Sequence, residues 1–411
     1  MDSIIYFTEK FSTARFVPPL LVLTLFAMPL SSTGKSVLLT FALIAILMAP
    51  AYRAQLSRAL VKPWCIAAFI LFGLALVGCL WSPATSSEKF LVVSKYSKLL
   101  YLPLLVIGFT DAKVRNDSIH AFMLAMLLTC IISILKFHGF LQSWHIDFDN
   151  VFRNHIMTGF MVAFASYLAV FFAYQQRDNK TRAFYLLVTV IYSYHVWFVN
   201  GGRTGYIIYL LLMGLLMVQL CTWRQAMAVL LIGCSLFAFM YLQSSHLRSS
   251  IGSVTRQLQD YHVNKIDNSA SLGLRLKFHD FAQTLFEKHP IAGNGTASFT
   301  YYFRIIRPVA AWVWRDGLAI PYGLLEPHSQ YWLVAAEFGI IGLLVLGYFF
   351  YSLFRASLKL KHMKTIALGM LVFFMIGNLS DSLLFYSGSG YFFLLIMAVC
   401  LGEQVEEDGP I

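Results

Sequence analysis

Long apolar runs recur along almost the whole of this sequence, and they limit its fold more than any other feature. A helix that crosses the hydrocarbon core of a bilayer needs about 17–25 mainly apolar residues. The runs are continuous, whereas the strands of a membrane barrel alternate in polarity over about ten residues. The sequence therefore predicts an all-α polytopic membrane protein of about 12 transmembrane helices. The predicted spans lie near residues 16–32, 36–52, 64–82, 97–110, 119–137, 156–175, 184–200, 205–221, 227–243, 330–352, 366–380 and 384–402.

Composition excludes most soluble classes of protein. Hydrophobic residues make up 58% of the chain and charged residues only 12%, against about 25% charged residues in soluble domains. The formal net charge of +11 does not indicate nucleic acid, because the Lys and Arg residues lie in short segments between apolar runs. This distribution favours membrane lipids and an anionic lipid ligand as partners.

The distribution of Lys and Arg also predicts the orientation of the chain. These residues concentrate in one of the two alternating sets of short segments, and cytoplasmic segments carry such an excess. Both termini are therefore expected in the cytoplasm, and the one long polar segment emerges on the outer side. We expect transmembrane helices 1–9 in residues 1–243, a periplasmic loop with short helices in 244–327, and helices 10–12 with a cytoplasmic tail in 328–411.

Within this loop, residues 274–287 predict an amphipathic helix. Leu274, Phe278, Phe281 and Leu285 recur at spacings of four and three residues. This spacing places the four apolar side chains on one helical face, which we expect to be buried.

The turn at residues 200–205 carries the first candidate for chemistry. Arg203 lies between two apolar runs with glycines on both sides, and a guanidinium at such a depth is costly without a partner. One interpretation is that the glycines let the backbone approach a ligand closely while the guanidinium of Arg203 binds a phosphate through two parallel hydrogen bonds. The other is that Arg203 snorkels to lipid headgroups.

The loop arginines have two interpretations as well. Arg304 and Arg307 follow aromatic residues, and both project from one face if the segment is helical. Together with Arg315 they either help to bind an anionic substrate or belong to an amphipathic helix in the headgroup layer.

His328 is the foremost candidate for catalysis. It follows Pro327 at the start of a predicted span, where an imidazole is held rigidly beside a site that is open to water. A lone histidine at a helix start can also be structural, so the interpretation depends on the motif around it.

Three motifs resemble those of the O-antigen ligase family. His328-Ser329, then nine residues, then Gly339-Ile-Ile-Gly342 fits the family pattern His-[Asn/Ser/Gln], nine residues, Gly-x-x-Gly. Residues 200–205 are similar to the arginine turn of the wider family of ligases and sugar polymerases, with asparagine and glycines in place of the commoner serine. Residues 289–295, His-Pro-Ile-Ala-Gly-Asn-Gly, are similar to the family's His-Pro-x-x-Gly-x-Gly segment and follow Arg275.

This resemblance implies a membrane-embedded glycosyltransferase of the GT-C type that needs no cofactor and no metal. Its donor would be a glycan on undecaprenyl diphosphate and its acceptor a sugar hydroxyl of lipid A–core, in lipopolysaccharide assembly. The implied location is the bacterial inner membrane, with the active site facing the periplasm. Such a transfer develops negative charge on phosphate and removes a proton from a hydroxyl, and arginines and a neutral histidine suit these two needs.

The resemblance implies a role for each motif residue. His328 is expected to be the general base, and Arg203 and Arg275 are expected to bind the diphosphate. The residues expected to contact substrate around them are Arg304, Arg307, Arg315, Ser329, Asn294, Gly293, Gly295, Glu326 and Asp381.

A carboxylate on the second ring nitrogen would fix the tautomer of His328. Either Glu326 or Asp381 is expected to supply it, whereas Glu337 lies nine residues further on, about half a turn out of phase on a helix. The segment Arg153-Asn154-His155 lies at another outer boundary and can line the same cavity. Neither H-E-x-x-H nor a clustered Asp motif occurs on the outer side, which favours metal-independent chemistry.

Two other functions remain open. An O-antigen polymerase uses the same lipid diphosphate chemistry with an undecaprenyl-linked acceptor, although the His-Ser motif favours the ligase. A secondary transporter or lipid flippase would also have about a dozen spans. It would show inverted repeats and charges near the bilayer midplane, and the sequence contains no evident repeat.

Overall fold

The computed structural model describes residues 13–141, 151–243, 245–262, 271–308, 312–315, 318–321 and 323–407. Helices form nearly all of the regular structure in these ranges, as expected. A short antiparallel hairpin, β1 (Trp312–Arg315) with β2 (Leu318–Pro321), is the one sheet in the described part of the chain. The main helices are α2 (Val17–Leu30), α3 (Ser32–Met48), α4 (Pro50–Leu60), α5 (Pro63–Val77), α6 (Ser86–Tyr96), α7 (Leu102–Gly108), α8 (Ala112–Phe137), α9 (His155–Gln175), α10 (Asn179–Tyr194), α11 (Arg203–Leu220), α12 (Trp223–Gln243), α13 (Ser245–His262), α14 (Ser271–Lys288), α15 (Ser298–Ile306), α16 (Gln330–Leu358), α17 (Lys364–Ser380) and α18 (Ser387–Glu407).

Short helical turns join some of these helices. A 3-10 turn, η1 (Thr13–Phe16), precedes α2, and η2 (Gly78–Leu80) follows α5. The turn η3 (Ser97–Tyr101) links α6 to α7, so that Ser86–Gly108 forms one long apolar element. A π-helical turn, η4 (His195–Val199), follows α10 directly.

The chain is a polytopic helical membrane protein, but with fewer full-length spans than the predicted 12. Every predicted span coincides with a helix. Only eight segments in the described residues are long and apolar enough to cross a membrane, or nine if the bent pair α3 and α4, which turns by 94°, is one span. Part of α11 and the whole of α17 are apolar but shorter. The eight are Thr13–Leu30, Pro63–Leu80, Ser86–Gly108, Ala112–Phe137, His155–Gln175, Asn179–Val199, Gln330–Leu358 and Ser387–Glu407.

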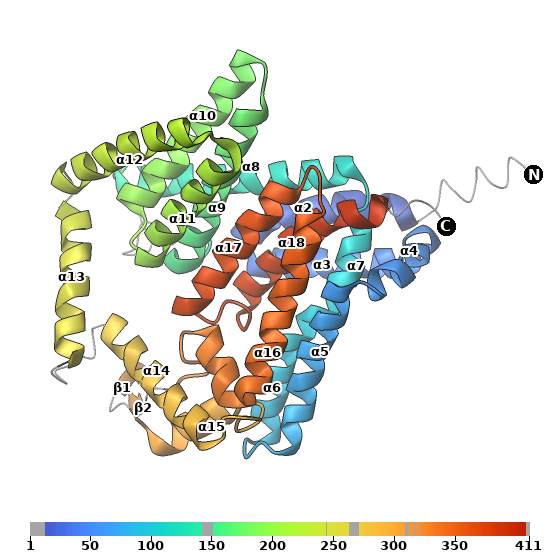
Figure 1. The fold of residues 1–411 in the computed structure, drawn as a ribbon, viewed down its shortest axis with the longest axis vertical. Helices are drawn as coiled ribbons and strands as arrows, with labels where there is room; N and C mark the ends of the chain where they lie inside the picture. Colours follow the sequence, from blue (N-terminus) through green and yellow to red (C-terminus); the bar gives the residue numbers. More distant parts are fainter. Residues whose placement is uncertain are drawn as a thin grey trace, which may run out of the picture.

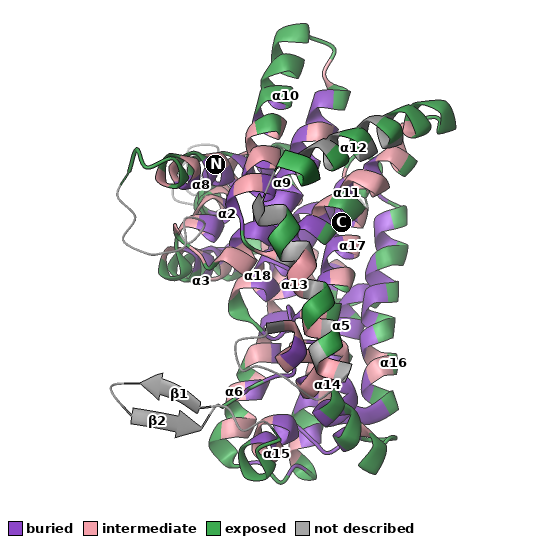
Figure 2. Cartoon of the chain, turned by 90° about the vertical axis from the view of Figure 1, so that its left-hand side faces the viewer, coloured by how far each residue is buried: buried purple, intermediate pink, exposed green. Residues whose placement is uncertain are grey.

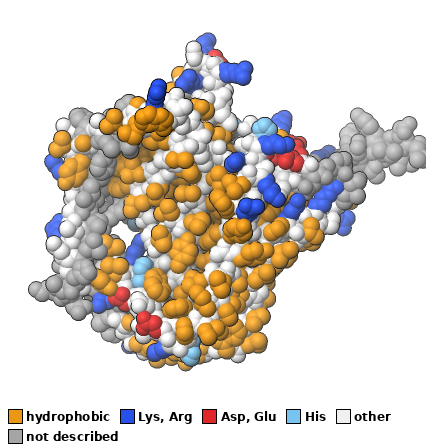
Figure 3. Space-filling view, in the orientation of Figure 1, with side chains coloured by type: hydrophobic (Ala, Val, Ile, Leu, Met, Phe, Trp, Pro, Cys, Tyr) orange, Lys and Arg blue, Asp and Glu red, His pale blue; other side chains and the backbone are white. Residues whose placement is uncertain are grey.

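Two helices, α9 and α18, form the centre of the molecule. In each of them 83% of the apolar window is buried, compared with 33–61% in the other spans, and Figure 2 shows both helices largely in the buried colour. Figure 1 shows α17 and α18 between the group α8–α11 and the pair α5 and α16. Hydrophobic side chains cover most of the face in Figure 3, as expected for helices that face lipid.

The predicted amphipathic helix is present as α14, and its apolar face is buried as expected. Phe278, Phe281 and Leu285 are buried, and Leu274 packs against the same core. The ring of Phe303 from α15 lies edge-on to both phenylalanines, with centroids 5.7 Å apart. Helices α14 and α15 therefore form one small layer at the N-terminal end of α16.

Helix α16 is broken near its start, at Gly339, where φ is 63°. The N–H groups of Ile340 and Ile341 donate to the carbonyls of residues 290 and 291 at 2.8 and 3.2 Å. In the opposite direction, the N–H groups of residues 294 and 295 donate to the carbonyls of residues 336 and 337 at 3.1 and 2.8 Å. Unsatisfied backbone groups cost several kcal/mol each in an apolar environment, so this pairing allows the span to break. The pairing also places the first turns of α16, and the site before them, against α14.

Candidate active site

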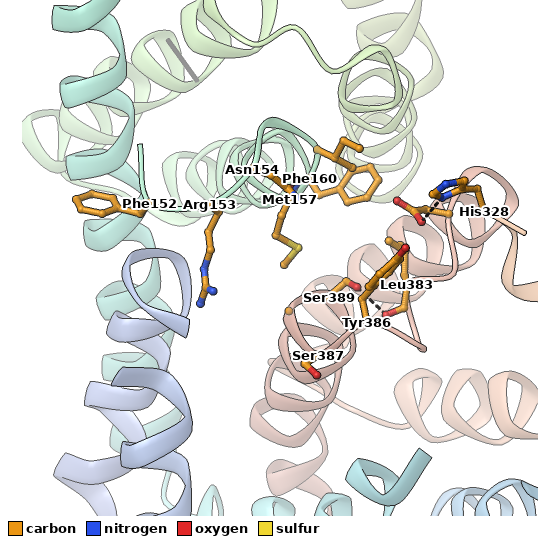
Figure 4. Close-up of a pocket in the computed structure, with 13 residues that line it drawn as sticks. Phe152, Arg153, Asn154, Met157, Phe160, His328, Leu383, Tyr386, Ser387 and Ser389 are labelled. Carbon is orange, nitrogen blue, oxygen red and sulfur yellow. Dashed lines mark hydrogen bonds and ion pairs between the residues drawn. The ribbon is translucent and has the colours of Figure 1, made fainter. Parts of the chain in front are cut away.

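A cavity of about 570 Å³ lies between the start of α9, the residues before α16 and the turn that joins α17 to α18. Figure 4 shows Arg153 and His328 on opposite sides of this cavity. Polar groups therefore reach one space from elements that are far apart in the sequence. The lining residues are Phe152, Arg153, Asn154, Ile156, Met157, Phe160, His328, Asp381, Leu383, Tyr386, Ser387, Gly388 and Ser389.

Two carboxylates hold the ring of His328, and both act on the same nitrogen. Nδ1 lies 2.9 Å from Oε1 of Glu326 and 3.4 Å from Oδ1 of Asp381. These acceptors assign a proton to Nδ1. Nε2 has no hydrogen-bond partner among the described residues. The structure thus brings together both carboxylates that the sequence offered as alternatives, and it leaves Nε2 as the ring atom available to a ligand.

The backbone at His328 is held in an unusual conformation. Its φ is 56°, a left-handed value that is uncommon for a residue other than glycine and is frequent at functional sites. Its N–H donates to Oε2 of Glu326 at 2.6 Å, so one carboxylate binds both the backbone and the ring. Nε2 of His279, on α14, lies 3.4 Å from the carbonyl oxygen of His328. These contacts orient the imidazole before any substrate binds.

The carboxylates determine the charge of His328. Burial disfavours the charged ring, but the hydrogen bonds and negative charges of Asp381 and Glu326 outweigh burial and raise the pKa of His328 to about 9. Burial alone would raise the pKa of Glu326, yet His328 and a 2.6 Å hydrogen bond from the hydroxyl of Tyr386 lower it. Glu326 is therefore a fully buried carboxylate that remains ionised because its partners stabilise the charge.

The same three residues could in principle hold a metal ion. One ligand atom each of Glu326, His328 and Asp381 lies within 4.8 Å of the other two. A histidine nitrogen must lose its proton to bind a metal, whereas Nδ1 here has a carboxylate oxygen on each side. The arrangement fits a hydrogen-bonded network better than a metal centre, and metal independence remains a prediction that is tested below.

Arg203, expected to be catalytic, is the first residue of α11, and its side chain lies outside the part that the structure describes. The turn before it is built around Asn200, whose Oδ1 accepts from the N–H of Gly202 at 2.5 Å. A Cβ on Gly159 of α9 would lie 2.5 Å from Nδ2 of Asn200. The asparagine and the glycines therefore allow α11 to start in close contact with α9, beside the cavity residues at the start of α9.

Arg275 extends from α14 toward the site and contacts the end of α17. Nη1 of Arg275 donates to the carbonyl of Ser380 at 2.8 Å. Ser380 is the last residue of α17 and precedes Asp381, and a cation at a helix C-terminus is favourable. In this structure Arg275 therefore stabilises the end of α17 that carries Asp381.

The other loop arginines lie elsewhere. Arg304 forms a surface ion pair with Glu88 at 3.2 Å, and Arg307 is exposed at the end of α15. Neither of them lines the cavity. The side chain of Arg315, in β1, lies outside the described residues. The placement of Arg304 and Arg307 agrees with the amphipathic-helix interpretation, because the opposite face of α15 buries Phe299 and Phe303.

Four further residues expected near substrate have structural contacts. Nδ2 of Asn294 donates to two backbone carbonyls at 2.8 and 2.9 Å. Gly293 and Gly295 have φ of 67° and 91° and lie where a Cβ would meet neighbouring backbone. Ser329 caps the N-terminus of α16. The His-Pro-x-x-Gly-x-Gly motif therefore pairs with the broken α16 and contributes no residue to the lining of the cavity.

Several cavity residues had only a weak signal in the sequence. The segment 153–155 was expected only to line the cavity, and of its residues Arg153 and Asn154 do so whereas His155 does not. Tyr386 and the segment 387–389 were not singled out. Nη2 of Arg153 donates to the carbonyl of Met28 at 2.7 Å, while its buried Nε has no hydrogen bond to any residue that the structure describes. The signal that was available is the polar segment between two apolar runs near Asp381, which ends in Ser-Gly-Ser-Gly.

Comparison with known families decides the class of protein. Residues 188–347 match the family model described as O-antigen ligase. The chain carries an O-antigen ligase domain. This match confirms the family identified from the three motifs, and members of the family are glycosyltransferase-type enzymes that include ligases and polymerases. A search of curated proteins finds no match to the chain.

The O-antigen ligase domain contains only part of the cavity. His328 lies inside the matched segment, whereas Arg153, Asp381 and Tyr386 lie outside it. Segments on both sides of the domain in the sequence therefore complete the site. They are the residues just before α9, the turn between α17 and α18, and the first turns of α9 and α18.

Proposed function

We propose that this protein is an O-antigen ligase that transfers a glycan en bloc from undecaprenyl diphosphate to a sugar hydroxyl of lipid A–core. The observation that carries the proposal is His328, oriented through Nδ1 by two carboxylates at a cavity whose opposite side bears Arg153. Transfer from a diphosphate to a hydroxyl needs a base for the hydroxyl and cations for the leaving group. Family membership supplies lipid-linked glycans as the class of substrate.

In the proposed mechanism, Nε2 of His328 accepts the proton of the acceptor hydroxyl while the hydroxyl oxygen attacks the anomeric carbon. The bond from this carbon to the diphosphate oxygen breaks as the glycosidic bond forms on the opposite face. The transfer therefore inverts the anomeric centre, and undecaprenyl diphosphate leaves with the electron pair. Glu326 and Asp381 stabilise the imidazolium that forms, as a buried carboxylate does in catalytic triads.

We assign the diphosphate to the side of the cavity that carries Arg153. The buried Nε of Arg153 has no hydrogen-bond partner within the described ranges, and the segment 387–389 lines the same space at the start of α18. The free N–H groups at a helix start favour anions, and an arginine binds phosphate oxygens through several donors. Arg203 would add a second cation from the start of α11, while Arg275 acts by holding Asp381 in place.

Orientation in the membrane is part of the proposal. We place this GT-C-type protein in the bacterial inner membrane with both termini in the cytoplasm, residues 244–327 as the periplasmic loop and the cavity open to the periplasm. The excess of Lys and Arg in one set of connecting segments supports this orientation. The lipid-linked donor and the lipid A–core acceptor can then reach the same face.

Transfer by the purified protein, assayed in a chelator, tests this function. The substrates are undecaprenyl-diphosphate glycan and lipid A–core, and we expect a glycolipid product at an undiminished rate. Elongation of the undecaprenyl-linked glycan without transfer to lipid A–core would identify a polymerase instead. Loss of activity in the chelator, restored by a divalent cation, would show that the Glu326, His328 and Asp381 cluster acts as a metal site.

The pH dependence of transfer tests the role of His328. A base acts in its neutral form, so we expect kcat/KM to rise about tenfold per pH unit and to level off near pH 9, the pKa of this residue. Glu326→Gln removes one of the charges that raise this pKa and should shift the profile toward the ordinary histidine value of about 6.5. Glu88→Gln, which alters a carboxylate that pairs with Arg304 and does not line the cavity, is the matched control. A profile that falls with rising pH would instead make His328 an acid.

A further inference from the structure

A buried lysine lies behind the wall of the cavity. Lys98, in η3, is only 1% exposed, and the charged groups nearest to it are the lysines Lys95 and Lys35. No ion pair of Lys98 occurs in the described part of the chain. A buried ammonium group is costly unless polar atoms compensate its charge, so its contacts need an explanation.

Three consecutive backbone carbonyls receive this ammonium group. Nζ of Lys98 donates to the carbonyl oxygens of Leu384, Phe385 and Tyr386 at 2.7, 3.3 and 2.9 Å. An ammonium group has three N–H donors, and these contacts use all of them. Lys98 therefore holds the last three residues of the turn between α17 and α18, immediately before the start of α18.

This turn carries two of the groups that act on the histidine. Asp381, at its beginning, contacts Nδ1 of His328 at 3.4 Å. Tyr386, at its end, donates to Oε1 of Glu326 at 2.6 Å, and the same oxygen lies 2.9 Å from Nδ1. A change in the position of the turn would move both groups relative to the imidazole.

We propose that Lys98 is a positioning residue for the site: by holding the turn 381–386 from behind, it keeps Asp381 and Tyr386 in place around His328. The inference rests on the proposed role of His328 and deepens it. Lys98 touches neither the ring nor the cavity, so it acts only through the turn.

The neighbouring helix leaves room for this contact. A Cβ on Gly390, in α18, would come 2.5 Å from Nζ of Lys98 and 3.0 Å from the carbonyl oxygen of Leu384. Gly390→Ala should therefore push the ammonium group away from the turn while leaving its charge in the protein. Lys98→Met removes the charge and keeps an apolar stem of similar length.

The two ways in which Lys98 could influence His328 have opposite signs. Loss of a cation favours protonation of a nearby imidazole and raises its pKa, whereas loss of Asp381 and Tyr386 from their places lowers it. The charged and titratable groups that face the histidine are Glu326, Asp381 and Tyr386, His279 from α14 with Arg275 behind it, and Arg153 across the cavity. Neither Lys98→Met nor Gly390→Ala alters any of these groups.

The test is the pH dependence of carbethoxylation of His328 by diethylpyrocarbonate in the purified protein, followed by peptide mass spectrometry. This reagent attacks neutral imidazole, and the readout needs no substrate, so it stands even if the proposed function fails. We expect a midpoint of about 9 in the unaltered protein, and a midpoint lower by at least about one pH unit in both Lys98→Met and Gly390→Ala.

Lys95→Met is the matched control, because Lys95 is a nearby cation that lies 6.0 Å from the ring centroid of Phe385 and makes no hydrogen bond to the turn among the described residues. It should leave the midpoint unchanged or raise it slightly. An unchanged or raised midpoint in both Lys98→Met and Gly390→Ala would overturn the proposal. A raised midpoint in Lys98→Met with no shift in Gly390→Ala would show a purely electrostatic effect and would also overturn it.

Discussion

Replacement of His328 by alanine is expected to lower kcat/KM for transfer to lipid A–core by about 10²–10⁴-fold, the contribution typical of a general base. The loss should be this large because Nε2 of His328 is the one ring atom in the network that is left for a substrate. Glu326 and Asp381 would remain in place, but both carboxylates would lie behind the position from which the proton is taken. The measurement is the initial rate with purified donor and acceptor at a pH near 9.

The matched control for this prediction is His289→Ala. His289 is an exposed histidine of the His-Pro motif, and its loss should leave transfer within about twofold of the unaltered rate, as is usual for surface substitutions. Retention of more than a tenth of the activity in His328→Ala would move the base to another residue. A comparable loss in both variants would indicate that the assay reports folding and not catalysis.

Gly339→Ala is expected to have the largest effect on stability. A Cβ at this position would lie 2.4 Å from the carbonyl oxygen of Ile291, and the backbone φ of 63° disfavours any side chain. Overpacking costs about 1–3 kcal/mol and the left-handed conformation about 1–2 kcal/mol more. The alanine would also separate α16 from the residues that pair with its break. We therefore expect a loss of several kcal/mol, visible as a much lower Tm or as aggregation in detergent.

Gly347→Ala, on the same helix, is the control for Gly339→Ala. A Cβ there would meet no atom within 4 Å, and a glycine in a helix interior costs about 1 kcal/mol relative to alanine. The Tm of Gly347→Ala should thus be unchanged or slightly higher. Equal stability of the two variants would contradict the view that the Gly-x-x-Gly motif is a structural break.

The motifs indicated the right family, but contacts distinguish two roles among their residues. His328 lies at the cavity, while Gly293, Asn294 and Gly339 hold the break in α16 together. In the sequence both kinds of residue belong to compact motifs. Sequence spacing cannot distinguish a glycine that lets a ligand approach the backbone from a glycine that lets a second backbone segment approach it. Both positions require a residue without a side chain.

The membrane helices and the buried face of α14 followed from local sequence, because hydropathy and helical period are properties of short segments. The number of full-length spans did not, since the bend after α3 and the short α17 depend on packing. For His328 the sequence offered Glu326 or Asp381 as a partner, and only the structure showed that both carboxylates contact the ring. Only the tertiary structure decided that Arg153 lies across the cavity from His328, that Arg275 binds the end of α17, and that Lys98 supports the turn from behind. These contacts join residues that are far apart in the chain, and the packing of whole helices, chiefly α9 and α18, brings them together.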